Sequence, residues 1–362
     1  MLLTVIAISI GVLFAMNIGA SGAAASMGIA YGSGTLTKRT ALCLSGIAVF
    51  LGAYFGGGEV VDTIGSGIVP GSTFTVAIAL IVLAAATLSL LLANLFGIPL
   101  STSEVAVGSV VGAGVVYQSV YVGKLAWIAL FWLFTPFVAF VIAVIAATLL
   151  KTKPIHQWMQ QKKIRPIFAI LVVIMGSFEA FSGGMNNVAN AVGPLVAAGI
   201  IGKDQGIFGG GLAIALGAIL FGHRVIETNG KKITDLRLEE GCVLSGTGAG
   251  IVMIASLLGI PVPLTQITTS SIIGMGFVKQ GIAVVKKDIV VKLLTVWIVS
   301  PVLSMVLSYT IIQLVIVKNI YPVIAMAGVM ISVLGVLFLV KKTDGRATPL
   351  SMKEELKLIK KG

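Results

Sequence analysis

The sequence is poor in the residue types on which soluble enzymes and metal proteins depend. Only 10% of its 362 residues are charged, whereas soluble domains carry about 25%, so a soluble globular protein is excluded. Two cysteines, Cys43 and Cys242, and two histidines give no basis for a disulfide framework or a metal centre. His156 and His223 both fall in expected loops, so no Ser-His-Asp set can form. We therefore expect neither an enzyme nor a bound cofactor.

Long apolar runs take the place of the missing charge. Hydrophobic residues make up 57% of the chain, and the mean hydropathy is +1.08. Runs such as 74–96 are continuous, which indicates membrane-crossing helices of about 20 residues and not a barrel. We expect an all-α, multi-pass protein of the cytoplasmic membrane with about 11–12 transmembrane segments. The net charge of +12 comes from short loops, which orient membrane proteins, so no nucleic acid partner is expected.

The two halves of the chain repeat each other. Leu-Gly-Ala occurs at 51–53 and 216–218, which lie 165 positions apart, and Gly-Ile-Pro occurs at 97–99 and 259–261, which lie 162 apart. Such a duplication with Gly/Pro-interrupted segments predicts a transporter whose site lies between the repeats, near the middle of the membrane. The expected parts are a first repeat at 1–150, a basic cytoplasmic linker at 151–165, a second repeat at 166–317, an additional transmembrane helix at 318–340 and a basic tail at 341–362.

The stretch 182–194 is unusually polar for a segment between apolar runs, since it holds Asn186, Asn187 and Asn190. We expect it to converge with 19–28, 99–108 and 261–270, which are also rich in small and polar residues. The polar side chains of these four segments are almost all neutral, so an anion would be held by helix N-termini and side-chain dipoles. The alternative is a structural role, in helix packing for the Asn and in helix capping for the Ser and Thr.

Two motifs in these segments carry a family resemblance. Residues 184–191 read Gly-Met-Asn-Asn-Val-Ala-Asn-Ala, and residues 99–103 read Pro-Leu-Ser-Thr-Ser. They resemble the inorganic phosphate transporter family, whose repeated signature is Gly-Ala-Asn-Asp-Val-Ala-Asn-Ala, followed later by Pro-Val-Ser-Thr-Thr. The counterparts at 19–26 and 261–265 match less well, and the resemblance covers residues 1–317. It implies a secondary anion transporter with two inverted-topology repeats, broken or re-entrant half-helices and a homodimeric assembly.

The chain departs from this family at both signature aspartates, where it has Gly22 and Asn187. In the family these positions are tied to sodium and substrate, so sodium coupling is in doubt. A carboxylate only accepts hydrogen bonds, which suits a protonated phosphate but not sulfate, which carries no proton at neutral pH. Some bacterial members regarded as sulfate permeases resemble this chain over 15–26, so we expect sulfate, with phosphate as the alternative. The candidate substrate-binding residues are Ser21, Gly22, Ala23, Ser101, Thr102, Ser103, Asn186, Asn187, Asn190, Thr265 and Gln266.

Entry of a dianion into a negative cell must be coupled to cations, because it costs about 4.6 kcal/mol per 100 mV, twice the value for one charge. The acids near the expected site are Glu104, where many family members have His, and Glu179, which precedes Asn186. Either is a candidate proton carrier, and the alternative is a hydrogen-bonded structural carboxylate. We expect a proton-coupled sulfate symporter. A sodium- or proton-coupled phosphate symporter is the alternative, and a passive anion channel is less favoured.

Overall fold

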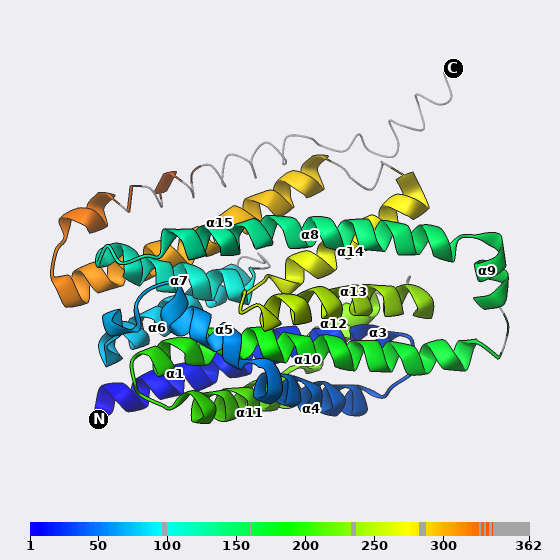
Figure 1. Ribbon diagram of the computed structural model, residues 1–362, viewed down its shortest axis with the longest axis horizontal. Coiled ribbons are helices and arrows are strands. Elements are labelled where there is room, and N and C mark those ends of the chain that lie inside the picture. The colour runs from blue at the N-terminus through cyan, green and yellow to red at the C-terminus, as the bar shows by residue number, and fades with distance from the viewer. Residues whose placement is uncertain are drawn as a thin grey trace, which may run out of the picture. The chain divides into compact units, whose positions relative to one another are not determined.

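A computed structural model of the chain describes residues 1–95, 100–159, 161, 163–232, 237–281, 287–325, 327–328, 331–332 and 335. None of these residues lies in a strand, and helices make up the regular structure (Figure 1). The chain forms a compact unit, Met1–Ile312, and a second unit, Gln313–Gly362. The α-helices are α1 (Leu2–Ile18), α2 (Ala24–Ser26), α3 (Gly28–Gly32), α4 (Lys38–Gly56), α5 (Gly58–Asp62), α6 (Val76–Leu95), α7 (Thr102–Val116), α8 (Val122–Leu150), α9 (Lys153–Met159), α10 (Arg165–Ala197), α11 (Lys203–Phe221), α12 (His223–Lys232), α13 (Leu238–Leu257), α14 (Leu264–Gln280) and α15 (Lys287–Ile312).

Eight helical stretches within the described residues are long and apolar enough to cross a membrane, which confirms a multi-pass, all-α protein. The helix α7 is apolar but has only 15 residues, as expected for one of the short polar-tinged segments. The expected interruption at 97–99, part of the additional helix at 318–340 and the tail at 341–362 lie outside the described residues.

The asparagine-rich stretch does not interrupt its helix, although a break was expected there. The helix α10 runs without a gap over 33 residues, and every residue from Ser182 to Leu195 is buried. Gly and Asn have low helix propensity, but packing on all sides and side-chain partners for each Asn outweigh that preference. The counterpart in the first repeat is interrupted, because α1 passes into a wider π turn at Gly19–Ala23 before the short helices α2 and α3.

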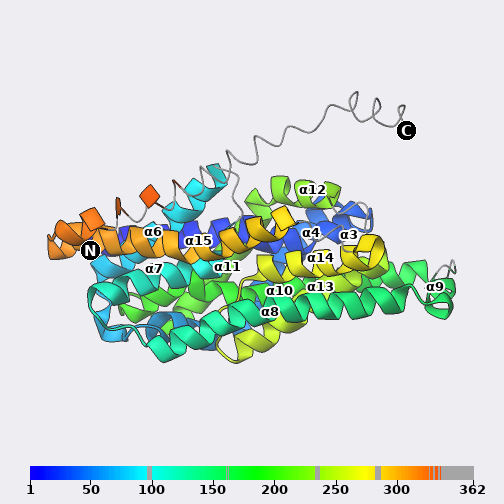
Figure 2. The ribbon, with the colours of Figure 1, turned by 90° about the horizontal axis from the view of Figure 1, so that it is seen from above.

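The two repeats pack by exchanging helices. In the first repeat α1 lies against α11 of the second repeat, and its equivalent α10 lies against α4 of the first. The same exchange pairs α7 with α15 and α14 with α8 (Figures 1 and 2). The equivalent helices α1 and α10 run in opposite directions (Figure 1). An exchange of this kind is expected of two repeats related by an approximate two-fold axis, and their inverted orientation across a membrane stays a prediction.

Glycines at equivalent positions allow the exchanged helices to touch backbone to backbone. A Cβ atom on Gly19 would lie 1.8 Å from the Ile214 carbonyl oxygen, and one on Gly184 would lie 2.1 Å from that of Val49. Both pairs recur at the 165-residue spacing found in the sequence. Close approach through small residues is a common basis of helix association in lipid. The repeat spacing therefore corresponds to a repeated contact in the fold.

Candidate substrate-binding site

Side chains of α10 and of the first turn of α7 form one buried hydrogen-bond network. The Oδ1 atom of Asn187 accepts from Thr102 Oγ1 at 3.2 Å and from Asn190 Nδ2 at 3.1 Å. Ser103 Oγ accepts from Asn186 Nδ2 at 2.9 Å and from Asn190 Nδ2 at 3.4 Å. Buried polar groups that satisfy one another are held rigidly. Segments more than 80 residues apart in sequence thus build one fixed polar patch inside an apolar protein.

Asn186 also binds the backbone of the extended segment that precedes α14. Its Oδ1 accepts from the Val262 amide at 3.0 Å, and its Nδ2 donates to the Val262 carbonyl at 2.9 Å. This pair of hydrogen bonds to one residue fixes which way the amide points. The equivalent residue in the first repeat is Ser21, which is exposed and donates to the Asn17 carbonyl of its own helix at 2.9 Å. The Asn186 side chain therefore binds the backbone of a distant segment, whereas the equivalent Ser21 side chain binds only its own helix.

Glu104 and Gln266 occupy equivalent positions of the two repeats and contact each other. Gln266 Nε2 donates to Glu104 Oε1, and the two side chains are buried. Equivalent residues can touch only near the axis that relates the repeats, so this pair lies at the centre of the fold. Glu104 Oε2 and Gln266 Oε1 are buried and form no hydrogen bond of normal distance and angle within the described residues, although the Ser300 hydroxyl lies next to the Glu104 carboxylate. Such unpaired atoms at a central position are uncommon in stable structural pairs and call for an explanation.

A small cavity adjoins the network where the π turn and α10 face each other. Its volume is about 10 Å³, and its lining includes Gly22, Ala23, Glu179, Gly183 and Asn187. Gly22 and Asn187 are again equivalent positions, so the cavity also lies near the axis. About 10 Å³ holds one water molecule, and a tetrahedral oxyanion needs more room. The cavity in this conformation is therefore too small for such an anion.

The amide nitrogen of Asn187 lies near Gly183 beside this cavity. It lies 3.9 Å from the position that a Cβ atom on Gly183 would take, and both residues line the space. A Cβ atom on Gly22 would meet nothing within 4 Å. The oxygen of the Asn187 amide is already used by Thr102 and Asn190. The nitrogen is therefore the donor that remains for a ligand.

The structure brings most of the candidate residues together but sets three apart. Ser21 and Thr265 are exposed, and Thr265 accepts from Thr269 only through its own carbonyl. Ser101 is buried at the start of α7 but takes no part in the network. The residues that meet at the cavity or in the network are Gly22, Ala23, Thr102, Ser103, Glu179, Asn186, Asn187 and Asn190, with Glu104 and Gln266 as a separate pair.

Sequence reasoning missed two hydroxyl groups beside the two acids. Ser245 lies next to the Glu179 carboxylate together with Thr268 of the expected segment 261–270, and Ser300 lies next to the Glu104 carboxylate. Ser and Thr are frequent in membrane helices as packing residues, so nothing in the local sequence marked Ser245 or Ser300. The Val262 backbone was missed for a different reason, because a main-chain contact has no side-chain signature.

Charged groups are paired away from this site. The ion pairs of the described residues join Lys38 to Glu227 at 2.5 Å, Lys203 to Asp62 at 2.5 Å, and Arg237 and Lys279 to acids at the start of α13. No Lys or Arg lines the cavity. Within the part of the chain that the structure describes, no three His, Cys, Asp or Glu side chains converge as metal ligands would. The site therefore offers neutral dipoles and two buried carboxyl groups.

Comparison with known proteins identifies relatives of the chain. The chain matches the model of the Phosphate transporter family over residues 18–308. It is 52% identical over 336 residues to Sulfate permease CysP of Bacillus subtilis (strain 168), which covers 92% of this chain and 94% of that protein. It is 31% identical over 385 residues to a putative phosphate permease of Pyrococcus abyssi (strain GE5 / Orsay), covering 83% and 94%.

A solved structure described as "The sodium-dependent phosphate transporter" has the same fold. The TM-score is 0.74 at 25% sequence identity, and the match covers 87% of this chain and 100% of that one. These relatives are permeases and transporters, so the chain is a transport protein and not an enzyme. From the family match over most of its length and the identity to these relatives, the chain belongs to the phosphate transporter family.

Proposed function

We propose that this protein is a secondary transporter that imports sulfate together with protons. The observation that carries the proposal is the neutral network of Thr102, Ser103, Asn186, Asn187 and Asn190, in which Asn187 stands where the family signature has an aspartate. The relative that is 52% identical is named a sulfate permease, whereas the solved structure at 25% identity is described as a sodium-dependent phosphate transporter. This contrast supports sulfate, and phosphate remains the second candidate.

The chemistry of the two anions explains the preference. Phosphate at neutral pH keeps at least one proton and can donate it to a carboxylate, whereas sulfate has only acceptor oxygens. A carboxylate beside sulfate would repel it and leave an acceptor unmatched. The amide nitrogen of Asn187 and the open space at Gly22 present no such acceptor to the ligand. Gly22 and Asn187 thus favour the fully ionised anion, provided that Glu179, which also lines the cavity, is protonated when the anion binds.

Protons are the coupling ion that the remaining acids support. Glu179 lines the cavity next to Gly22 and Asn187, and Glu104 lies at the axis with one oxygen that forms no hydrogen bond of normal geometry within the described residues. A protonated carboxyl group can donate a hydrogen bond where the charged form cannot, so proton uptake would change what these groups offer to a bound anion. Sodium would need several oxygen ligands in place of the absent signature aspartates.

Uptake into liposomes by purified protein tests both parts. We expect labelled sulfate to accumulate while a proton gradient lasts, and excess unlabelled sulfate to compete better than phosphate. Glu104→Gln and Glu179→Gln should abolish gradient-driven accumulation but keep sulfate exchange across the membrane. The matched control Glu59→Gln alters a carboxylate outside the cavity and the network and should behave like wild type.

Three outcomes would contradict the proposal. Phosphate could compete better than sulfate, accumulation could require sodium, or both glutamine variants could still accumulate sulfate. Equilibration without accumulation under any gradient would indicate a passive channel.

A further inference from the structure

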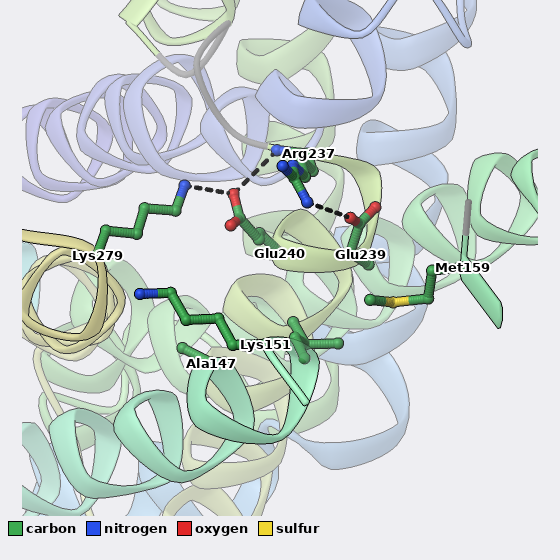
Figure 3. Close-up of a pocket in the computed structure, with 8 residues that line it drawn as sticks. Ala147, Lys151, Met159, Arg237, Glu239, Glu240 and Lys279 are labelled. Carbon is green, nitrogen blue, oxygen red and sulfur yellow. Dashed lines mark hydrogen bonds and ion pairs between the residues drawn. The ribbon is translucent and has the colours of Figure 1, made fainter. Parts of the chain in front are cut away.

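A second cavity lies about 20 Å along α14 from Gln266, at 1.5 Å per residue, where several helices end (Figure 3). Its volume is about 580 Å³, within the range of small-molecule sites. Its lining combines the end of α8, the last residue of α9, the start of α13 and the last turn of α14. The lining residues are Ala147, Leu150, Lys151, Met159, Arg237, Glu239, Glu240 and Lys279.

The charges in this cavity leave one positive charge unmatched. Lys279 Nζ binds Glu240 Oε2 at 2.7 Å, and Arg237 Nη1 lies 3.9 Å from Glu239 Oε1. The ammonium group of Lys151 binds the Val278 carbonyl, and no carboxylate of the described residues lies within ion-pair distance of it. The three cations and two anions sum to a charge that one monoanion would neutralise.

The cavity lies at the end of a helix that can cross a membrane. The helix α8 is long and apolar enough to span, and Ala147 and Leu150 near its end line the cavity. Ile142, Ile145 and Leu149 are exposed on the opposite face of α8. The basic linker that follows Lys151 is expected on the cytoplasmic side. The cavity thus lies at the level of the lipid headgroups.

We propose that this cavity binds the headgroup of an anionic phospholipid with one negative charge and free hydroxyl groups, such as phosphatidylglycerol. Its phosphodiester would lie between Lys151 and Lys279, and its hydroxyl groups would donate to Glu239 or Glu240. Basic pockets between membrane helices on the cytoplasmic side recognise anionic headgroups in this way. The proposal does not depend on which anion the protein transports.

Native mass spectrometry of the detergent-purified full chain tests the proposal by titration with phosphatidylglycerol and phosphatidylcholine. Wild type should retain phosphatidylglycerol in preference. Lys151→Gln should weaken that retention about fivefold, because one Lys near an anionic lipid is worth roughly 1 kcal/mol. Lys151→Arg should retain the lipid like wild type. The matched control Lys153→Gln removes an exposed charge two residues away that does not line the cavity and should change nothing.

A second variant with the opposite expected effect keeps the test valid if Lys151→Gln fails to fold. Glu239→Gln raises the net charge of the lining by one and should strengthen phosphatidylglycerol retention. Unchanged retention in both Lys151→Gln and Glu239→Gln would overturn the proposal. So would an equal loss in Lys153→Gln, which would indicate a diffuse basic surface. Displacement of the lipid by millimolar inorganic phosphate would also overturn it, because a soluble anion would then occupy the cavity instead.

Discussion

Replacement of Asn187 by Asp tests how the site distinguishes the two oxyanions. The substitution is nearly isosteric, and the retained oxygen can still accept from Thr102 and Asn190, so the network should persist. The change occurs at the nitrogen, which lies near Gly183 beside the cavity. A hydrogen-bond donor becomes a charged acceptor at the position where the ligand must bind.

Two contributions set the size of the effect. Loss of a hydrogen bond to a charged ligand costs about 1.5–3 kcal/mol, which is roughly a tenfold to hundredfold loss of affinity. Repulsion between unit charges at about 4 Å and an effective dielectric constant near 20 adds about 4 kcal/mol, and a dianion doubles this value. Repulsion therefore dominates, and sulfate affinity should fall by more than about 1000-fold.

Phosphate should suffer less, because its proton can bridge to the new carboxylate. In uptake assays with both labelled anions, the ratio of sulfate to phosphate transport should fall at least about 100-fold in Asn187→Asp, as the repulsion above requires. Asn187→Ala is the control, since it removes the donor without adding charge and should lower both activities with little change in the ratio. An unchanged ratio in a folded Asp variant would refute the assignment of Asn187 to substrate selection.

Two further predictions concern the packing around the site. Asn186→Ala leaves the buried backbone groups of Val262 without partners, so it should lower the free energy of unfolding by about 1–3 kcal/mol; a melting temperature equal to that of wild type would contradict this role of Asn186. Gly52→Ala should destabilise the protein by a similar amount, because its Cβ atom would lie 1.8 Å from the Phe181 carbonyl oxygen. Gly22→Ala is the matched variant in open space, and it should keep the melting temperature but weaken sulfate uptake by narrowing the cavity.

Local composition was sufficient to predict that the chain is a membrane protein and that its fold is all-α. Helices are recognised from continuous apolar runs because each span satisfies its own backbone in lipid. The duplication was also visible, since Gly and Pro at a constant spacing mark contacts that both repeats need. The pair Gly19 and Gly184 illustrates this, because each allows the same close approach in its own repeat. Fold class and family therefore follow from residue types and their spacing.

The geometry of the site depended on tertiary structure. Low helix propensity suggested a break at 182–194, but packing keeps α10 continuous through Asn187. Similarity of motifs suggested equal roles for Ser21 and Asn186, but only Asn186 reaches the Val262 backbone. Whether a side chain in a membrane helix contacts a distant residue depends on the angles and positions at which the helices cross. The hydropathy of the sequence does not report this geometry. Sequence by itself determined that polar residues lie inside an apolar, repeated chain, and tertiary structure alone decided which of them face one another.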